Sequence, residues 1–162
     1  MWGPNFMDLL ARTSTVLFVF VAGCELFDPR KAFFCALLTA LPLFGIFNAC
    51  WWNAQAETFM LPLLAGSAWL CLRSMNQEKG GALLFLGLAG FLCGQAVMLK
   101  LTAVIHVLFL ALWIVWKRQA RERRTLRIYL GPLPWFLGGV VVAIFLWLVY
   151  FTLKGALFHL WE

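Results

Sequence analysis

Long apolar stretches make up most of the chain, and the charged residues are concentrated in the short segments between them. The longest stretch, residues 81–116, is apolar except for Lys100, Thr102 and a few small polar residues. As one helix it would be about 54 Å long at 1.5 Å per residue, whereas the hydrocarbon layer of a bilayer is about 30 Å thick. The stretch must therefore break. We expect one helix to end at Leu99 and a second to begin near Thr102, whose hydroxyl group can cap it.

The remaining apolar stretches also predict helices, because no long segment alternates polar and apolar residues as a barrel strand does. Pro42 and Pro62 fall inside two of these stretches, and membrane helices tolerate such prolines. The sequence therefore predicts an all-α fold, a polytopic transmembrane helix bundle of about six spans that forms one integral membrane domain. The predicted spans are residues 9–27, 32–51, 58–72, 82–99, 102–116 and 130–153.

The composition supports a membrane protein. Hydrophobic residues make up 64% of the chain and charged residues 12%, and the mean hydropathy of +0.88 is far above that of soluble domains. Nine Trp and sixteen Phe residues suit a protein with aromatic anchors at the membrane interface. The cysteines form no CxxC pair and no metal-ligand pattern with His, so we assign no metal site and interpret them as small packing residues. They are Cys24, Cys35, Cys50, Cys71 and Cys93.

The distribution of basic residues predicts an orientation. Six spans would place ten Lys and Arg residues in the loops after the first, third and fifth spans, six of them between positions 117 and 127. The opposite face would carry three, namely Arg12, Lys100 and Lys154. The positive-inside rule then makes the basic loops cytoplasmic, and we expect an integral protein of the bacterial inner (plasma) membrane. Topology explains the net charge of +6, so we expect no nucleic-acid partner. The basic run is interpreted as an anchor near anionic lipid, with regulation or the binding of another partner as the alternative.

The extracytoplasmic face collects the candidate site residues. Glu57 begins the third span, and Lys100 lies between the fourth and fifth. A carboxylate there can orient or deprotonate a hydroxyl group, and an ammonium group can hold a phosphate. Asn53, in the polar loop before Glu57, is a further substrate-binding candidate. The alternative is structural, since a helix dipole favours an acid in the first turn and a lysine can extend its side chain to water.

Three further features lie within the spans. Gly87, Gly90 and Gly94 share one helix face, which predicts close packing against another helix. Gln95 is expected to bond to a neighbouring helix rather than to a ligand. His106 has two interpretations, an interhelical hydrogen bond or a substrate or metal contact, and we favour the first.

Three segments resemble the polytopic GT-C glycosyltransferases of the protein O-mannosyltransferase and aminoarabinose-transferase type. They are residues 25–32 (ELFDPRKA), residues 53–61 (NAQAETFML) after a helix with Pro42, and residues 87–103, which run from GLAG to LKLTA. The resemblance covers residues 12–116, about two thirds of the chain, and the last segment is the most specific.

The resemblance implies a transferase that takes a sugar from a polyprenyl-phosphate carrier on the extracytoplasmic side and passes it to an acceptor. In such enzymes the lysine that matches Lys100 lies close to the carrier phosphate, and the acid that matches Glu57 faces the same cavity. A fixed cation there would stabilise the leaving phosphate. Family members also carry a catalytic acid in a large outer loop after a first membrane helix. Nothing around Asp8 matches that motif, so we expect the chain to be an internal piece or a truncated product.

Other possibilities stay open at this stage. The alternative function is a non-catalytic polytopic membrane protein, such as a transporter or a flippase module for lipid-linked intermediates. The expected partners are membrane lipid and the polyprenyl-phosphate sugar donor. No residue pattern requires a cofactor, although a divalent metal is compatible with the chemistry. The sequence does not define the sugar, the acceptor or the oligomeric state.

Overall fold

The computed structural model describes residues 3–44, 56–77, 81–121 and 131–155. These residues are almost all helical and form no strand, which confirms the predicted all-α class. The helices are α1 (Gly3–Leu26), α2 (Pro29–Phe44), α3 (Ala56–Asn76), α4 (Ala82–Leu99), the 3-10 helix η2 (Leu101–Ala103), α5 (Val104–Arg121) and α7 (Leu133–Leu153).

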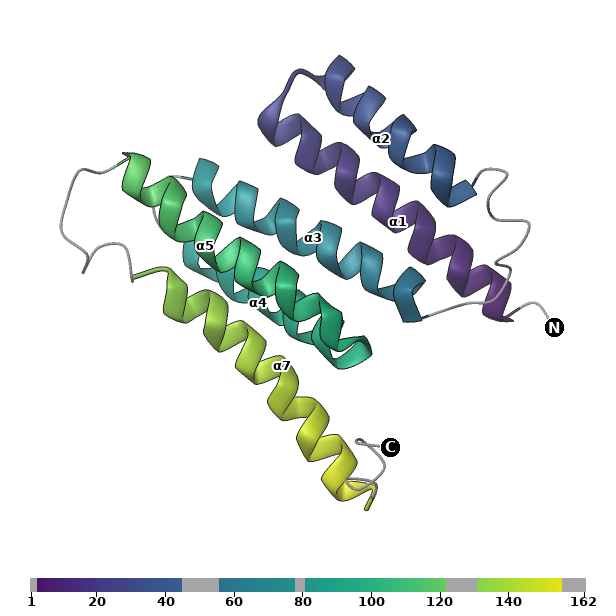
Figure 1. The fold of residues 1–162 in the computed structure, drawn as a ribbon, viewed down its shortest axis with the longest axis vertical. Coiled ribbons are helices and arrows are strands. Elements are labelled where there is room, and N and C mark those ends of the chain that lie inside the picture. Colours follow the sequence, from purple (N-terminus) through teal and green to yellow (C-terminus); the bar gives the residue numbers. More distant parts are fainter. Residues whose placement is uncertain (1–2, 45–55, 78–80, 122–130, 156–162) are drawn as a thin grey trace.

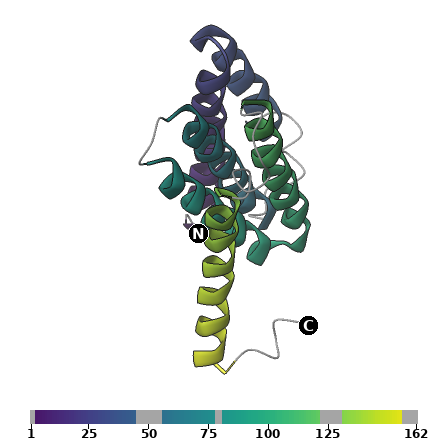
Figure 2. The same ribbon diagram turned by 90° about the vertical axis from the view of Figure 1, so that its left-hand side faces the viewer.

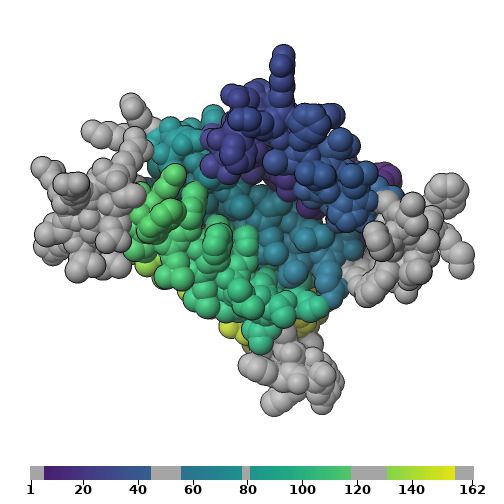
Figure 3. Space-filling view, turned by 45° about the horizontal axis from the view of Figure 1, so that its top comes forward, coloured from purple at the N-terminus to yellow at the C-terminus, as the bar shows by residue number. Residues whose placement is uncertain are grey.

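Five helices form a row in the order α2, α1, α3, α4, α7, and each contacts the next (Figure 1). Helix α5 lies outside this row and contacts α3, α4 and α7; in Figure 3 it lies across the front of the molecule beside α3. Helices that follow one another along the chain run in opposite directions, so the neighbouring pairs α1–α3 and α4–α7 of the row are parallel (Figure 1). The ends of the helices therefore form two faces. We call the face with the start of α3 and the end of α4 the Lys100 face, and the face with the ends of α3 and α5 the basic face.

Four described helices are long and apolar enough to cross a membrane by length and composition. Helix α2 has 16 described residues, and residues 45–51 of the predicted second span lie outside the described part. The apolar helix Leu101–Lys117 is also shorter than the other four. Many large apolar side chains are exposed on the outside of these helices, which suits contact with lipid rather than with water. The four candidate spans are Phe6–Leu26, Ala56–Asn76, Ala82–Leu99 and Leu133–Leu153.

The helix bounds differ from the predicted spans mostly at the ends. Helix α1 begins at Gly3, before position 9, and helix α3 continues to Asn76, past position 72. The sequence pattern used charged or polar residues as boundaries, yet a helix can continue into the interface as long as its backbone bonds are satisfied. Helix α4 spans residues 82–99, as the apolar pattern predicts.

The hydrophobic core lies where α3, α4, α5 and α7 meet. It includes Cys71 of α3, Cys93 of α4, Ile114 of α5 and Phe136 of α7, all fully buried. The predicted glycine face of α4 packs against α7. A Cβ atom added at Gly90 would collide with the carbonyl group of Phe136, and one added at Gly94 would lie 2.6 Å from Cβ of Ala143. The absence of side chains thus lets the two backbones touch, which confirms the close packing expected from the sequence.

Helix α7 makes its contacts with α4 mainly through its first half. Phe136, Val140 and Ala143 are buried, whereas the later Tyr150 and Leu153 are exposed. Figure 2 shows the C-terminal half of α7 extending beyond the other described helices.

Candidate functional site

The backbone breaks at Lys100, as the length of the apolar stretch predicts. Helix α4 ends at Leu99, and Lys100 is extended, with φ −157° and ψ 124°. Its N–H group donates to the carbonyl of Ala96 at 3.0 Å, and its own carbonyl accepts from the N–H group of Ala103 at 3.0 Å. Thr102 does not begin the next helix, because it lies inside the 3-10 turn η2 and α5 starts only at Val104. The short turn satisfies backbone groups that a simple break would leave free.

The structure brings Glu57 and Lys100 together. Glu57 lies in the first turn of α3, and its Oε1 accepts a hydrogen bond from Nζ of Lys100, which forms an ion pair between α3 and the break. The side chains are 46% and 42% exposed, respectively. Exposed ion pairs contribute about 0–1 kcal/mol, so this contact is not a major source of stability. The half-exposed ammonium group remains open to a further anion. The third candidate, Asn53, lies outside the described residues.

A second polar contact joins α3 to α5 deeper in the bundle. Nε2 of His106 lies 3.1 Å from Oγ of Ser67, and this hydroxyl also donates to the carbonyl of Leu64 at 2.8 Å. The Ser67 hydroxyl group therefore accepts from His106, which requires the Nε2–H tautomer. The interhelical interpretation of His106 is confirmed. Ser67 is ten residues after Glu57, or about 15 Å further along α3. The Lys100–Glu57 and His106–Ser67 contacts therefore join α3 to the α4–α5 segment at two different depths in the bundle.

Gln95 also bonds to a neighbouring helix, as expected. Its Oε1 accepts from Nε1 of Trp147 at 2.7 Å, which adds one polar contact to the α4–α7 interface. On the basic face, Glu25 accepts from Nη1 of Arg73 at 2.9 Å and from Nδ2 of Asn76 at 2.8 Å. This cluster joins the ends of α1 and α3, and its three members each have a partner, so we interpret it as structural.

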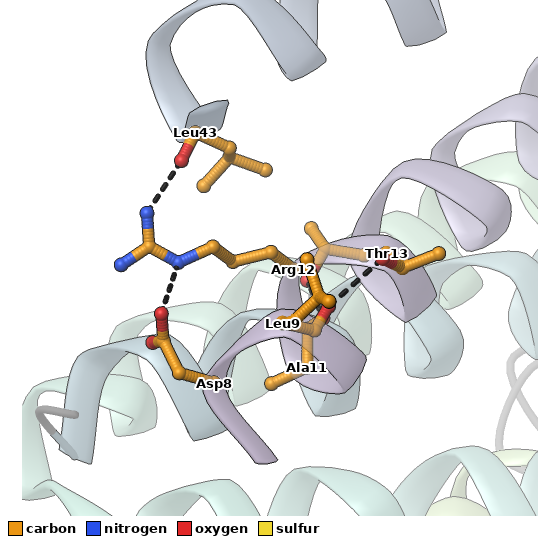
Figure 4. Close-up of polar contacts among 7 residues, drawn as sticks. Asp8, Leu9, Ala11, Arg12, Thr13 and Leu43 are labelled. Carbon is orange, nitrogen blue, oxygen red and sulfur yellow. Dashed lines mark hydrogen bonds and ion pairs between the residues drawn. The ribbon is translucent and has the colours of Figure 1, made fainter. Parts of the chain in front are cut away.

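Arg12 has a role that the sequence analysis did not predict. The charge count placed it on the face opposite the basic loops, but it lies inside α1 and is 9% exposed. Figure 4 shows its guanidinium group between two partners: Nε lies 2.7 Å from a carboxylate oxygen of Asp8, and Nη1 donates to the carbonyl of Leu43 in α2. A buried cation needs such partners. The sequence did indicate the Asp8–Arg12 pair, because residues four apart lie on one helix face.

Cysteine and histidine residues do not form a metal centre in the described part of the chain. No group of three or more His, Cys, Asp or Glu side chains there could hold a metal ion. Cys71 and Cys93 are buried and pack in the core, whereas Cys24 and Cys35 are exposed on the outside of the bundle. Cys50 lies outside the described residues.

The fold and these contacts define an integral membrane protein, an all-helical polytopic bundle with a Lys–Glu pair at a helix break on one face. The family comparison narrows this class. The model of the dolichyl-phosphate-mannose-protein mannosyltransferase family matches residues 1–154, and the chain belongs to this family of GT-C type membrane glycosyltransferases. Searches of curated proteins and of solved structures gave no match.

Proposed function

We propose that the chain carries the donor side of a sugar-transfer site, where Lys100 binds the phosphate of a polyprenyl-phosphate-linked sugar at the extracytoplasmic face. The observation that supports this most is the ion pair of Lys100 with Glu57 at the break after α4. An ammonium group has three N–H donors. The contact with Glu57 uses one, so the others are available for phosphate oxygens. The family uses lipid-linked sugar donors, which fits an anion site at the membrane surface.

Transfer of the sugar from its phosphate carrier is favoured by a positive charge at this position. When the glycosidic bond breaks, negative charge develops on the carrier phosphate, and a fixed ammonium group stabilises it more than mobile water does. Lys100 is held by backbone hydrogen bonds on both sides and by Glu57 at its tip. It would therefore need little rearrangement to meet the charge. Such preorganisation is the main means by which a protein accelerates the loss of an anionic leaving group.

For Glu57 the contact supports a positioning role. A carboxylate that is paired with Lys100 is a weaker base than a free one, because protonation would break the ion pair. We therefore propose that Glu57 orients the ammonium group, and that deprotonation of the acceptor hydroxyl is its alternative, catalytic role. Asn53 stays a predicted substrate contact.

The orientation is also a proposal. The basic face carries Arg73 and the end of α5 with Lys117, whereas Lys100 and Glu57 lie at the opposite end of α3 and α4. The positive-inside rule then places the basic face in the cytoplasm and the Lys100 face outside. A sugar donor with its head group at the outer leaflet would reach Lys100 from that side.

The test measures the rate of sugar transfer from a radiolabelled polyprenyl-phosphate sugar. It uses native membranes that contain the protein in the form in which the cell produces it. Lys100→Ala should lower the transfer rate at least about 100-fold, as the loss of one donor to a developing anion typically does. Lys100→Arg should retain part of the activity because it keeps the charge. Lys31→Ala is the matched control, since Lys31 is an exposed lysine paired with Asp28 on the basic face. Normal transfer by Lys100→Ala, at normal membrane insertion, would overturn the assignment.

A further inference from the structure

The Glu57 carboxylate lies on the same ammonium group that is proposed to bind the carrier phosphate. Oε1 of Glu57 accepts from Nζ of Lys100. A phosphate oxygen on a second N–H group of this Nζ would lie about 2.8 Å from it, and the tetrahedral ammonium group would then hold the two acceptors only about 4.5 Å apart. A phosphate at this position would therefore be attracted by Lys100 and repelled by Glu57.

Few other charges of the described residues can alter this balance. Asp8 carries the other described carboxylate near this face, but its Oδ2 lies 2.7 Å from Nε of Arg12 and both side chains are mostly buried. The charge of Asp8 is therefore largely cancelled by Arg12. Lys154 follows α7, whose C-terminal half extends beyond the other described helices (Figure 2). Glu57 is thus the carboxylate that a phosphate at Lys100 would meet.

The donor and the product of the proposed transfer differ in the charge of their phosphate. In the donor the phosphate is a diester with one negative charge. During transfer the bond between C1 of the sugar and the phosphate oxygen breaks and its electron pair stays on that oxygen, while C1 bonds to the acceptor oxygen, whose proton leaves. The product is a monoester, and because the second pKa of such a phosphate is about 6, it carries nearly two negative charges at neutral pH. Lys100 alone would therefore hold the product more tightly than the donor.

We propose, on the basis of the Lys100 site proposed above, that Glu57 disfavours the dianionic product, polyprenyl phosphate, relative to the donor and so promotes its release. Lys100 attracts the additional negative charge of the product, and Glu57 cancels part of this attraction. Two unit charges about 6 Å apart in a water-like surrounding change a binding constant about three-fold. The ion pair is half exposed, so this lower limit of the Coulomb interaction applies.

Inhibition of sugar transfer by two lipids that do not react tests the proposal. Polyprenyl phosphate and its methyl ester have the same chain, but at pH 8 they carry about two charges and one charge, respectively. Their inhibition constants against the donor are measured in native membranes that contain the protein. Loss of the fixed position of Lys100 would weaken both lipids alike, so the ratio of the two constants reports the effect of charge. We expect Glu57→Gln to raise the preference for polyprenyl phosphate at least about three-fold.

Two variants separate charge from position. Glu57→Asp keeps a carboxylate on a shorter side chain and should change the preference less than Glu57→Gln does. Asp28→Asn is the matched control, because it removes the carboxylate of another exposed lysine pair, with Lys31 at 3.8 Å on the basic face. This control should not change the preference. If a variant transfers sugar too slowly for inhibition kinetics, displacement of radiolabelled polyprenyl phosphate by each lipid gives the same ratio.

The outcomes distinguish this role of Glu57 from the function proposed for Lys100. Lys100→Ala should weaken the binding of both lipids, and unchanged binding would overturn the phosphate site itself. If Lys100→Ala weakens both lipids but Glu57→Gln does not raise the preference for polyprenyl phosphate, Lys100 remains the phosphate site and the role of Glu57 in product release is overturned. Equal changes in Glu57→Gln and Glu57→Asp, or in Glu57→Gln and Asp28→Asn, would also overturn this role.

Discussion

Helix α4 contacts its neighbours in two different ways. Against α7 the contact is made by backbone, because Gly90 and Gly94 have no side chains that would hold the helices apart. Against α3, the α4–α5 unit is held by side chains, with polar contacts from Lys100 to Glu57 and from His106 to Ser67. The first interface depends on close contact of backbone atoms, whereas the second depends on polar side chains.

This difference suggests that the α7 side of α4 fixes the position of the helix, whereas the α3 side carries the groups that bind a ligand. A backbone contact at glycine cannot take up a ligand or a proton, so the α4–α7 side gives α4 a fixed position. The ion pair at the break is half exposed, and the ammonium group has N–H donors besides the one that bonds to Glu57. We therefore expect substitutions on the α7 side to change folding, and substitutions at the break to change binding and transfer.

The largest effect on stability is expected at Gly90. Gly90→Leu would place a side chain against the backbone of Phe136, which neither helix can avoid without moving apart. We expect a loss of about 3 kcal/mol in the free energy of unfolding, at the upper end of typical overpacking costs. Unfolding of the purified protein in mixed micelles, followed by circular dichroism during titration with a denaturing detergent, measures this loss. Gly138→Ala is the control and should be neutral, since Gly138 borders open space. Comparable losses for both variants would show that the close contact is not what holds α7.

The next effect concerns Glu57. If Glu57 positions Lys100, Glu57→Gln should raise KM for the donor about ten-fold with a smaller change in kcat, because the ammonium group loses its fixed place. A ten-fold change corresponds to about 1.4 kcal/mol, within reach of one hydrogen bond to a charged group. Steady-state kinetics over a range of pH measures both parameters. A fall in kcat at unchanged KM, with loss of a basic group from the pH profile, would instead assign Glu57 the catalytic role.

A smaller effect is expected for Ser67. Ser67→Ala removes the acceptor of His106 in the buried interface of α3 and α5, and the loss should be about 1 kcal/mol. Detergent unfolding again gives the value. His106→Leu combined with Ser67→Ala removes both polar groups and should be less destabilising than Ser67→Ala alone. A double variant that is much less stable than either single one would contradict a simple hydrogen-bonded pair.

Much of the framework was predictable from physical limits on a membrane helix. The bilayer thickness requires a break near Lys100, and the spacing of Gly87, Gly90 and Gly94 places them on one helix face. Both predictions use only distances along one helix, so a single sequence suffices.

Contacts between helices were less predictable, because one sequence does not specify which helices are neighbours or how each is rotated. The pattern placed Glu57 and Lys100 at the same membrane surface, yet their direct contact depends on the packing of α3 against α4. Arg12 was counted as a charge of the membrane surface because apolar residues become continuous only after it. Its acceptor in α2 is 31 residues away. The partner of Gln95, Trp147, is 52 residues away.

This last contact provides the smallest predicted effect and the sharpest test of the two kinds of interface. The Gln95–Trp147 hydrogen bond lies on the α7 side of α4, where glycine contacts already fix the helices. A double-variant cycle with Gln95→Leu and Trp147→Phe should therefore give a coupling energy of only about 0.6 kcal/mol, the average for interhelical hydrogen bonds in a membrane. Sugar transfer should not change. A coupling above about 2 kcal/mol would mean that side chains, and not glycine backbone, determine the α4–α7 interface, and the proposed division between a supporting and a reactive side of α4 would fail.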